Sequence, residues 1–197
     1  MNFKTPVLLM LFNRPEKIKG LYNILEQVKP NKIYISSDGP RTNNLSDKKK
    51  IKLVREIFEN PSWDCEVHKL YSSVNLGCWG NCIASINWFF KHEEEGIILE
   101  EDCMPSKSFF TYCNELLAKY RHEEKIMHIN GFDFFNNDEK KNNYYFSKLV
   151  HVWGWATWRR AWKNFVSKID SKIDQGRVNF VNKYYEDRQI SSWMLNY

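Results

Sequence analysis

Two hydrophobic patterns alternate along the chain up to about residue 130. Short runs of apolar residues have the length of β-strands, and the longer stretches between them repeat apolar residues every three or four positions, as amphipathic helices do. The predicted strands span residues 6–12, 32–36, 65–71, 96–102 and 126–130. The predicted helices start near residues 13, 46, 79 and 105. This order predicts an α/β fold with an open, mostly parallel sheet and helices on both faces.

The first predicted helix has sequence signals at both ends. Asn13 can cap it, Pro15 suits its first turn, and Glu16 completes an N-x-x-E capping box. Pro30 stops it. We therefore expect the chain to turn directly from the first strand into this helix.

Three consecutive carboxylates, Glu100, Glu101 and Asp102, follow the apolar run at 97–99. Adjacent like charges repel, and burial beside an apolar strand raises their pKa values unless a cation neutralises them. Hard cations such as Mn²⁺ or Mg²⁺ bind carboxylate oxygens, with one or two protein ligands completed by substrate phosphates. We expect a metal site here. The alternative is a solvated acidic turn, which is how we interpret residues 93–95 just upstream.

Polar residues also follow two other predicted strands. Asn13 and Arg14 come after the first strand, and Asp38 comes after the second. Ligands of open α/β sheets bind beyond the carboxyl ends of the strands, so we expect these residues to converge with the acidic triplet. Arg14 could face a phosphate or stack on a base, and Asp38 could accept a hydrogen bond from an imide or a ribose hydroxyl. Each also has a structural interpretation, Arg14 as a surface charge and Asp38 as a turn former.

Composition narrows the class of protein. A chain of 197 residues suits one large domain. Its net charge of +5 suits anionic small molecules or an acidic membrane surface and is too mild to indicate a nucleic-acid partner. The basic run at 48–50 is best interpreted as a solvated start of a helix.

The beginning of the sequence and the cysteines suggest a compartment. Residues 1–5 lead into a strand-length apolar run without the features of a signal peptide, and no run reaches membrane-spanning length. Five scattered cysteines favour free thiols in a reducing environment. We expect a cytoplasmic protein, and its basic charge is compatible with peripheral contact at the inner face of the membrane.

A tryptophan-rich block follows a polar stretch at 136–143. The spacing of Trp153, Trp155, Trp158 and Trp162 does not fit one helical stripe. We expect a bend at Gly154, with the first two tryptophans in a loop and the last two on the following helix, where they pack in the core.

Five segments together resemble a known family of enzymes. They are Phe12-Asn13-Arg14-Pro15, Asp38-Gly39-Pro40-Arg41, Asn75-Leu76-Gly77-Cys78, the stretch 97–110 and Trp153-Gly154-Trp155-Ala156-Thr157-Trp158-Arg159-Arg160-Ala161-Trp162. In this order, and over residues 5–165, they resemble nucleotide-diphospho-sugar transferases of the GT-A type. The resemblance is to the bacterial hemolysin-activation-like group, which is similar to alpha-mannosyl beta-N-acetylglucosaminyltransferase I. The tryptophan block is the most specific of these motifs.

The resemblance implies a GT-A fold with a mixed, mostly parallel sheet, and it implies roles for particular residues. Glu100-Glu101-Asp102 takes the place of the family's Asp-x-Asp-like motif. Asp102 would then bind the metal, while Glu100 and Glu101 would contact the ribose and the donor sugar. The remaining residues of the implied nucleotide-sugar site are Phe12, Asn13, Arg14, Asp38, Asn75, Trp153, Gly154 and Trp155.

The sequence departs from the family in its last segment. Relatives place the catalytic base, an Asp, directly after a Trp, whereas here Met194 follows Trp193. Asp187, Glu186 and Asp170 are nearby candidates for the base, and we assign the role to Asp187. We expect one GT-A-like domain over 1–197, with a nucleotide-sugar half at 1–135 and a partial acceptor half at 144–197.

Two functional hypotheses result. In the first, the protein is a metal-dependent glycosyltransferase that moves a sugar from a UDP-sugar or another nucleotide sugar to a glycan or lipid-linked acceptor, with inversion. In the second, it is a degenerate nucleotide-sugar-binding domain, which Met194 favours. A sugar-phosphate nucleotidyltransferase is a more distant alternative, because it would need a glycine-rich loop after the first strand.

Overall fold

The structure is a computed structural model that describes residues 3–132 and 144–169. The chain divides into two compact units, residues 1–159 and 160–197. In its described residues the first unit contains the sheet and the four helices α1 to α4. Helix α5, Arg159–Ile169, begins at the last residue of the first unit and supplies the described residues of the second, 160–169.

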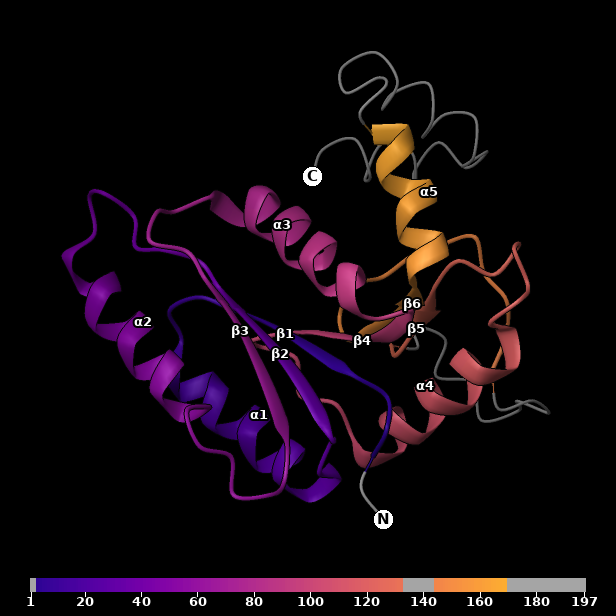
Figure 1. Ribbon diagram of the computed structural model, residues 1–197, viewed down its shortest axis with the longest axis horizontal. Coiled ribbons are helices and arrows are strands. Elements are labelled where there is room, and N and C mark those ends of the chain that lie inside the picture. The colour runs from indigo at the N-terminus through magenta and orange to yellow at the C-terminus, as the bar shows by residue number, and fades with distance from the viewer. Residues whose placement is uncertain (1–2, 133–143, 170–197) are drawn as a thin grey trace. The chain divides into compact units, whose positions relative to one another are not determined.

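A single six-stranded sheet organises the first unit (Figure 1). Its strands are β1 Val7–Leu11, β2 Lys32–Ser37, β3 Glu66–Tyr71, β4 Glu95–Glu100, β5 Ile129–Asn130 and β6 Trp155–Trp158. They are arranged in the order β3-β2-β1-β4-β6-β5. The first four lie parallel, and β6 runs antiparallel to both β4 and β5. The expected open, mostly parallel mixed sheet is confirmed.

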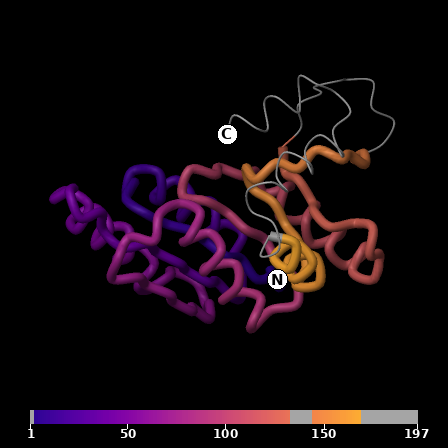
Figure 2. The backbone as a smooth tube through the Cα atoms, turned by 90° about the horizontal axis from the view of Figure 1, so that it is seen from above, coloured from indigo at the N-terminus to yellow at the C-terminus, as the bar shows by residue number. Residues whose placement is uncertain are grey.

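Helices cover both faces of this sheet. They are α1 Pro15–Val28, α2 Leu45–Ile57, α3 Gly77–His92 and α4 Lys107–Tyr120. In Figure 1, α3 lies on one side of the sheet, and α1, α2 and α4 lie on the other. The perpendicular view in Figure 2 shows α1 and α2, indigo to purple, toward one end of this unit and the salmon α4 toward the other. The Rossmann-like layering predicted from the alternating pattern is therefore present.

Strand β1 lies at the centre of the core, and all five of its residues are buried. Side chains alternate between the faces of a strand, so Val7, Leu9 and Leu11 join the apolar cluster under α1 and α4. On the other face, Tyr34 of β2 packs edge-on against Phe89 of α3, with ring centroids 5.0 Å apart. A strand that is buried on both faces consists of an unbroken run of apolar residues. This is why β1 could be predicted from the sequence.

The order of the strands creates a topological switch point between β1 and β4. The chain moves outward from β1 to β2 and β3, and α3 then returns it across the opposite face to β4. The connections that leave β1 and β4 lead to α1 and α4, which both lie on the face opposite α3, and they start side by side at the carboxyl edge of the sheet. In open α/β sheets, ligands bind in the crevice at this place, beyond the carboxyl ends of the strands.

The capping signal before α1 was wrong. Arg14, not Asn13, is the N-cap residue, and no side chain caps this helix end. The Asn13 amide instead donates to the Asp47 carboxylate, 2.8 Å away. A hydrogen bond to a charged carboxylate is stronger than one between two neutral groups. The Asn13 side chain therefore bonds to Asp47 and does not form the predicted capping box. Pro15 does occupy the first turn, as expected.

The tryptophan block also differs from its prediction in part. Gly154 has a φ of 73°, so the expected bend is present. Trp155, however, lies in strand β6 and not in a loop, and Trp158 ends that strand instead of starting the helix. Trp158 is nevertheless in the core, as predicted, because it is 2 % exposed and its indole N–H donates to the Leu117 carbonyl. Pairing with β4 extends this segment, which periodicity alone could not show.

The acidic run at 93–95 is the expected solvated segment only at Glu94, whose side chain is 76 % exposed, whereas those of Glu93 and Glu95 are 14 % and 17 % exposed. The Glu93 carboxylate accepts hydrogen bonds from the Tyr34 hydroxyl and the Lys32 ammonium, at 2.6 and 2.8 Å. Glu94 and Glu95 form ion pairs with Arg159 and Arg121. These cations come from distant parts of the chain, so the sequence did not reveal them.

Two further expectations can be compared with the structure. All five cysteines are free thiols, as predicted. Within residues 3–132 and 144–169, no helix is long and apolar enough to cross a membrane.

Candidate functional site at the switch point

Charged residues from β1 and β4 meet at the switch point. The chain leaves β1 through Phe12, Asn13 and Arg14, and β4 ends at Glu100, with Glu101 and Asp102 in the turn that follows. The two strands are paired in parallel, with Met10 opposite Glu100. This pairing places the residues after each strand side by side, as the sequence predicted.

Arg14 bridges the two connections. Its Nη1 donates to Asp102 Oδ2 at 2.6 Å, and its Nε lies 3.4 Å from Glu101 Oε1. The side chains of Arg14 and Asp102 are 50 % and 47 % exposed. An ion pair this exposed adds little to stability, because water solvates both partners well. Both charged groups thus remain accessible to a ligand.

The other two carboxylates of the triplet have different environments. Glu101 is 6 % exposed, and its Oε2 accepts the Phe12 backbone N–H at 2.8 Å. Glu101 therefore joins the β1 and β4 connections as a structural anchor. The Glu100 carboxylate makes no hydrogen bond or ion pair with any residue that the structure describes.

Burial affects the ionisation of both glutamates. It raises the pKa of Glu100, and the nearby charge of Asp102 raises it further while Arg14 opposes the shift. Burial also raises the pKa of Glu101, against which the Phe12 N–H and Arg14 act. Both carboxylates would be favoured in their charged form by an additional cation, which is what the sequence led us to expect.

Asp38 and Asn75 form a second cluster, at the end of β2. Asp38 is 4 % exposed, and its Oδ1 accepts the backbone N–H groups of Gly39 and Leu76, at 2.8 and 2.9 Å. The Asn75 amide donates to Asp38 Oδ2 at 3.0 Å and to the Gly39 carbonyl at 2.9 Å. A Cβ on Gly39 would lie 2.4 Å from the backbone of Val74. The two loops are thus in direct backbone contact, which requires glycine at this position.

A third cluster was not predicted. Asp47, in the first turn of α2, is completely buried. It accepts hydrogen bonds from Arg41 Nε and Nη2, at 2.7 and 2.9 Å, besides the one from Asn13. The Arg41 guanidinium also lies over the Phe12 ring, 5.4 Å from its centroid, and it lowers the pKa of Asp47. An acidic residue in the first turn of a helix is common on protein surfaces, so nothing in the sequence marked Asp47.

Gly154 brings the tryptophan block to the same edge of the sheet. A Cβ on Gly154 would lie 3.5 Å from the Leu99 side chain, one residue before Glu100. Trp153 is 62 % exposed and contacts the Phe132 ring edge-on, at 5.4 Å between centroids. Trp155 is 8 % exposed and stacks on the His128 ring, 4.8 Å away. Of the two tryptophans, Trp153 is the accessible one.

The donor set at the switch point fits a hard divalent cation with few protein ligands. The available groups are the carboxylate oxygens of Asp102 and Glu100, which Mg²⁺ and Mn²⁺ prefer. In the described ranges, no three His, Cys, Asp or Glu side chains are grouped to hold a metal. Substrate phosphates would have to complete the coordination, which is the usual arrangement for such ions.

The structure does not test the assigned base. Asp187 and Met194 fall outside the residues that the structure describes. The assignment of a base therefore stays a prediction.

This chain has a similar solved structure but no match at the level of sequence. No protein-family model matches the sequence, and no curated protein matches it either. A crystal structure of 4-diphosphocytidyl-2C-methyl-D-erythritol synthase from Anaerococcus prevotii is similar to this chain at 13 % identity and a TM-score of 0.47. The similarity covers 86 % of this chain and 76 % of that one. A likeness this distant assigns no ligand or reaction, and this protein is described by its own α/β, Rossmann-like fold.

Proposed function

We propose that this protein transfers a sugar from a nucleotide-diphosphate sugar, preferably a UDP-sugar, to a hydroxyl group of a glycan or lipid-linked acceptor. The main support is the arrangement at the switch point, where the exposed Arg14–Asp102 pair lies beside the unpartnered Glu100. A cation and carboxylates at the carboxyl ends of parallel strands suit a diphosphate, a divalent metal and a hydroxylated sugar.

Each part of the donor has residues of suitable chemistry. Arg14 supplies positive charge for the diphosphate, and Glu100 can accept hydrogen bonds from sugar or ribose hydroxyls. Phe12 offers an aromatic ring to the nucleobase, and Asn13 supports this turn through its hydrogen bond to Asp47. Asp38 and Asn75 act on the nucleobase by fixing the loop at 75–76, because their polar atoms already bond to one another.

On the sugar side of the site we place the tryptophan turn. Trp153 presents an exposed ring, and Gly154 allows a close approach of the backbone. Trp155 supports this turn from within β6. Glu101 holds the β4 connection in place through the Phe12 N–H.

The reaction is a direct displacement with inversion. The acceptor oxygen forms a bond to the anomeric carbon as the bond from that carbon to the diphosphate oxygen breaks. The nucleoside diphosphate leaves with the electron pair, and the acceptor proton passes to a general base, for which Asp187 is our assignment. When bound at Asp102, Mn²⁺ or Mg²⁺ would neutralise charge on the leaving diphosphate.

Binding and turnover can be tested separately. UDP titrated calorimetrically into the protein should bind more tightly with Mn²⁺ than without it. Asp102→Asn should abolish that metal dependence and lower the transfer or hydrolysis rate of a UDP-sugar at least about 100-fold. Asp64→Asn, which changes an exposed carboxylate before β3, is the matched control and should change neither quantity. Equal UDP affinity in wild type and Asp102→Asn, with and without metal, would refute the proposal.

The second hypothesis, a binding domain without catalysis, is favoured by Met194 at the position of the family's base. It predicts metal-dependent UDP binding with no release of UDP from any UDP-sugar, with or without acceptor. Cytoplasmic location and peripheral contact with an anionic membrane remain part of the first proposal. The net charge of +5 would attract the protein to anionic lipid. Sedimentation with vesicles that contain anionic lipid tests this membrane contact.

A further inference from the structure

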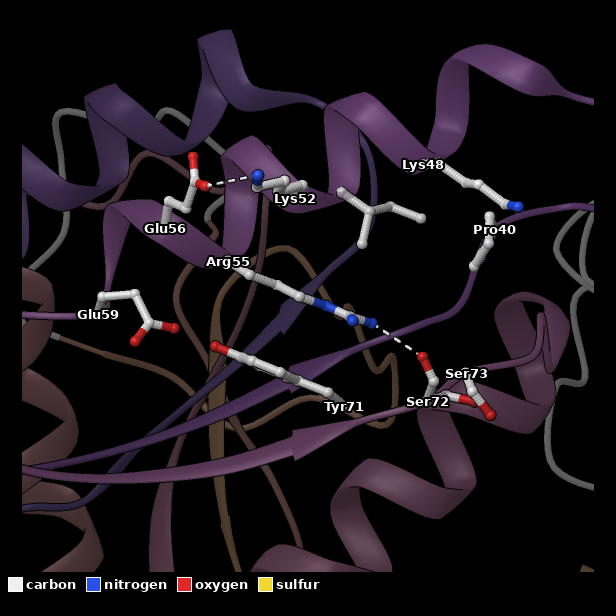
Figure 3. A pocket seen from close by; sticks show the side chains of 10 residues that line it. Pro40, Lys48, Lys52, Arg55, Glu56, Glu59, Tyr71, Ser72 and Ser73 are labelled. Carbon is white, nitrogen blue, oxygen red and sulfur yellow. Dashed lines mark hydrogen bonds and ion pairs between the residues drawn. The ribbon is translucent and has the colours of Figure 1, made fainter.

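A pocket lies on the β2 side of the sheet, next to the Asp38 cluster and not at the switch point. It has a volume of about 640 Å³ and is bounded by α2, the connection after β2 and the end of β3 (Figure 3). None of the residues that we assign to the nucleotide-sugar site lines it. The proposed nucleotide-sugar site therefore does not account for the side chains that line this pocket.

The central residue of this wall is Arg55. Its Nε donates to the Ser37 hydroxyl at 3.0 Å, and its Nη2 donates to the backbone carbonyls of Ser37, Asp38 and Ser72, at 3.2, 3.2 and 2.9 Å. Its Nη1 donates no hydrogen bond, and no carboxylate of the described residues forms an ion pair with it. Burial lowers the pKa of Arg55. A partly buried guanidinium that has no anionic partner among the described residues would be stabilised by an anion in the pocket.

Tyr71 adds an unsatisfied donor beside Arg55. The guanidinium lies over the Tyr71 ring, 4.5 Å from its centroid. The Tyr71 hydroxyl is buried and has no hydrogen-bond partner. Burial raises its pKa to about 12, so it keeps its proton at neutral pH. Buried polar groups are nearly always hydrogen-bonded, so this hydroxyl calls for an acceptor in the pocket.

The remaining side chains give the pocket two chemically different ends. In Figure 3, Lys48 and Ser73 lie at one end, Glu56 and Glu59 lie at the other, and Arg55 is between them. The ammonium of Lys48 forms no ion pair in the described part of the chain. The two glutamates already contact Lys52 and Lys69, at 3.7 and 3.1 Å. The uncompensated positive charge is thus concentrated at Arg55 and at the Lys48 end.

We propose that this pocket binds a sugar phosphate. The phosphate accepts hydrogen bonds from Arg55 Nη1 and the Ser73 hydroxyl, with Lys48 adding charge. The Tyr71 hydroxyl, which points toward the Glu59 end in Figure 3, donates to a sugar oxygen. The sugar hydroxyls donate to the carboxylates of Glu56 and Glu59. This combination explains the free cation, the unsatisfied hydroxyl and the acidic end with one ligand.

The test uses the full chain and two probes, glucose 6-phosphate and inorganic phosphate, followed by calorimetry and by ³¹P NMR. Glucose 6-phosphate should bind saturably and at least about tenfold more tightly than inorganic phosphate, because only it reaches both ends. Saturating UDP with Mn²⁺ should not displace it. Displacement would place the probe at the switch point and overturn the inference without affecting the proposed function.

Matched variants locate the binding. Lys48→Ala should weaken glucose 6-phosphate binding about tenfold, whereas Lys49→Ala, on the same exposed run but outside the pocket, should not. Tyr71→Phe should weaken binding without lowering the thermal midpoint of the free protein, because the lost hydroxyl has no partner in it. The inference fails if no probe binds, if both probes bind equally, or if the two lysine variants behave alike.

Discussion

Two neighbouring regions at the carboxyl edge of the sheet differ in whether their charged side chains are exposed or buried and paired. At the β1–β4 switch point, Arg14 and Asp102 are about half exposed, and the Glu100 carboxylate has no partner among the described residues. At the β2 side, Asp38 and Asp47 are buried, and internal donors engage both carboxylates. The difference separates charges that build the protein from charges that remain available to a ligand.

The pKa directions follow the same division. Hydrogen bonds from Arg41 lower the pKa of Asp47, so its charged form is favoured by folding. Burial raises the pKa of Glu100, so folding disfavours its charged form. A stable buried carboxylate has its donors within the protein, whereas one at the switch point would gain them from a bound cation or a substrate.

The largest expected effects come from replacing Arg14 at the switch point and, separately, Arg41 on the β2 side. Arg14→Gln should lower UDP affinity about 10- to 100-fold, because a charge-assisted contact to the diphosphate is lost, and it should leave stability nearly unchanged. Arg41→Gln should lower the thermal midpoint, because buried Asp47 loses its counter-charge. Calorimetry with UDP and thermal denaturation measure the two. If Arg41→Gln impaired UDP binding as strongly as Arg14→Gln, the division between the regions would not hold.

Gly39 tests how tightly the β2 side is built. A Cβ at this position would lie 2.4 Å from the carbonyl carbon and oxygen of Val74, so Gly39→Ala must move one of the two loops. We expect a loss of about 1–3 kcal/mol in the free energy of unfolding, as for other overpacked sites. Urea denaturation measures it. Gly80→Ala is the control, because its Cβ would meet only the Leu76 side chain, at 3.4 Å.

Replacing Asn75 tests whether the stability of the loop at 75–76 depends on its hydrogen bonds to Asp38 and Gly39. Asn75→Ala removes the bonds to Asp38 and to the Gly39 carbonyl, and we expect a loss of about 1–2 kcal/mol in unfolding free energy. UDP affinity should fall less than in Arg14→Gln, because the loop is loosened while the charges remain. Unchanged stability would show that these two bonds do not hold the loop.

The smallest effect is the acid dependence of the β2 side. The pKa of Asp47 is lower in the folded protein than its ordinary value of 3.8, so its contribution to stability is complete above pH 3.8. That contribution is lost progressively as the pH falls below 3.8. The stability difference between wild type and Asp47→Asn should therefore shrink over this acidic range and be constant above it. Urea denaturation at several pH values checks the sign.

Most strands and helices could be predicted because each leaves a local signature. Strand β1 is a continuous apolar run, and α4 repeats Phe109, Cys113 and Leu117 at helical spacing. Strand β6 left no such signature. Its residues Trp155 and Trp158 became strand because they pair with Ile98 and Glu95 of β4, a long-range contact that no local window contains.

The residues of the switch point were identifiable for a similar reason. Arg14 and Asp102 each follow a recognisable strand, and the end of a strand is a local feature. Glu101 and Glu100 could not be told apart in this way. The Phe12 N–H and Arg14, which reach Glu101 from the connection after β1, make Glu101 an anchor, whereas Glu100 has no such partner among the described residues.

The sequence by itself determined the α/β alternation, the apolar central strands and the presence of carboxylates and an arginine at strand ends. Backbone propensity and hydrophobic periodicity act within a few residues, so a single chain read in order contains them. Tertiary structure alone decided which charges are paired. Asp47 meets Arg41 and Asn13, and Arg55 has no ion-pair partner among the described residues, because folding joins segments that lie far apart in the chain. Coulomb and hydrogen-bond energies depend on such distances in space and not on separation in sequence.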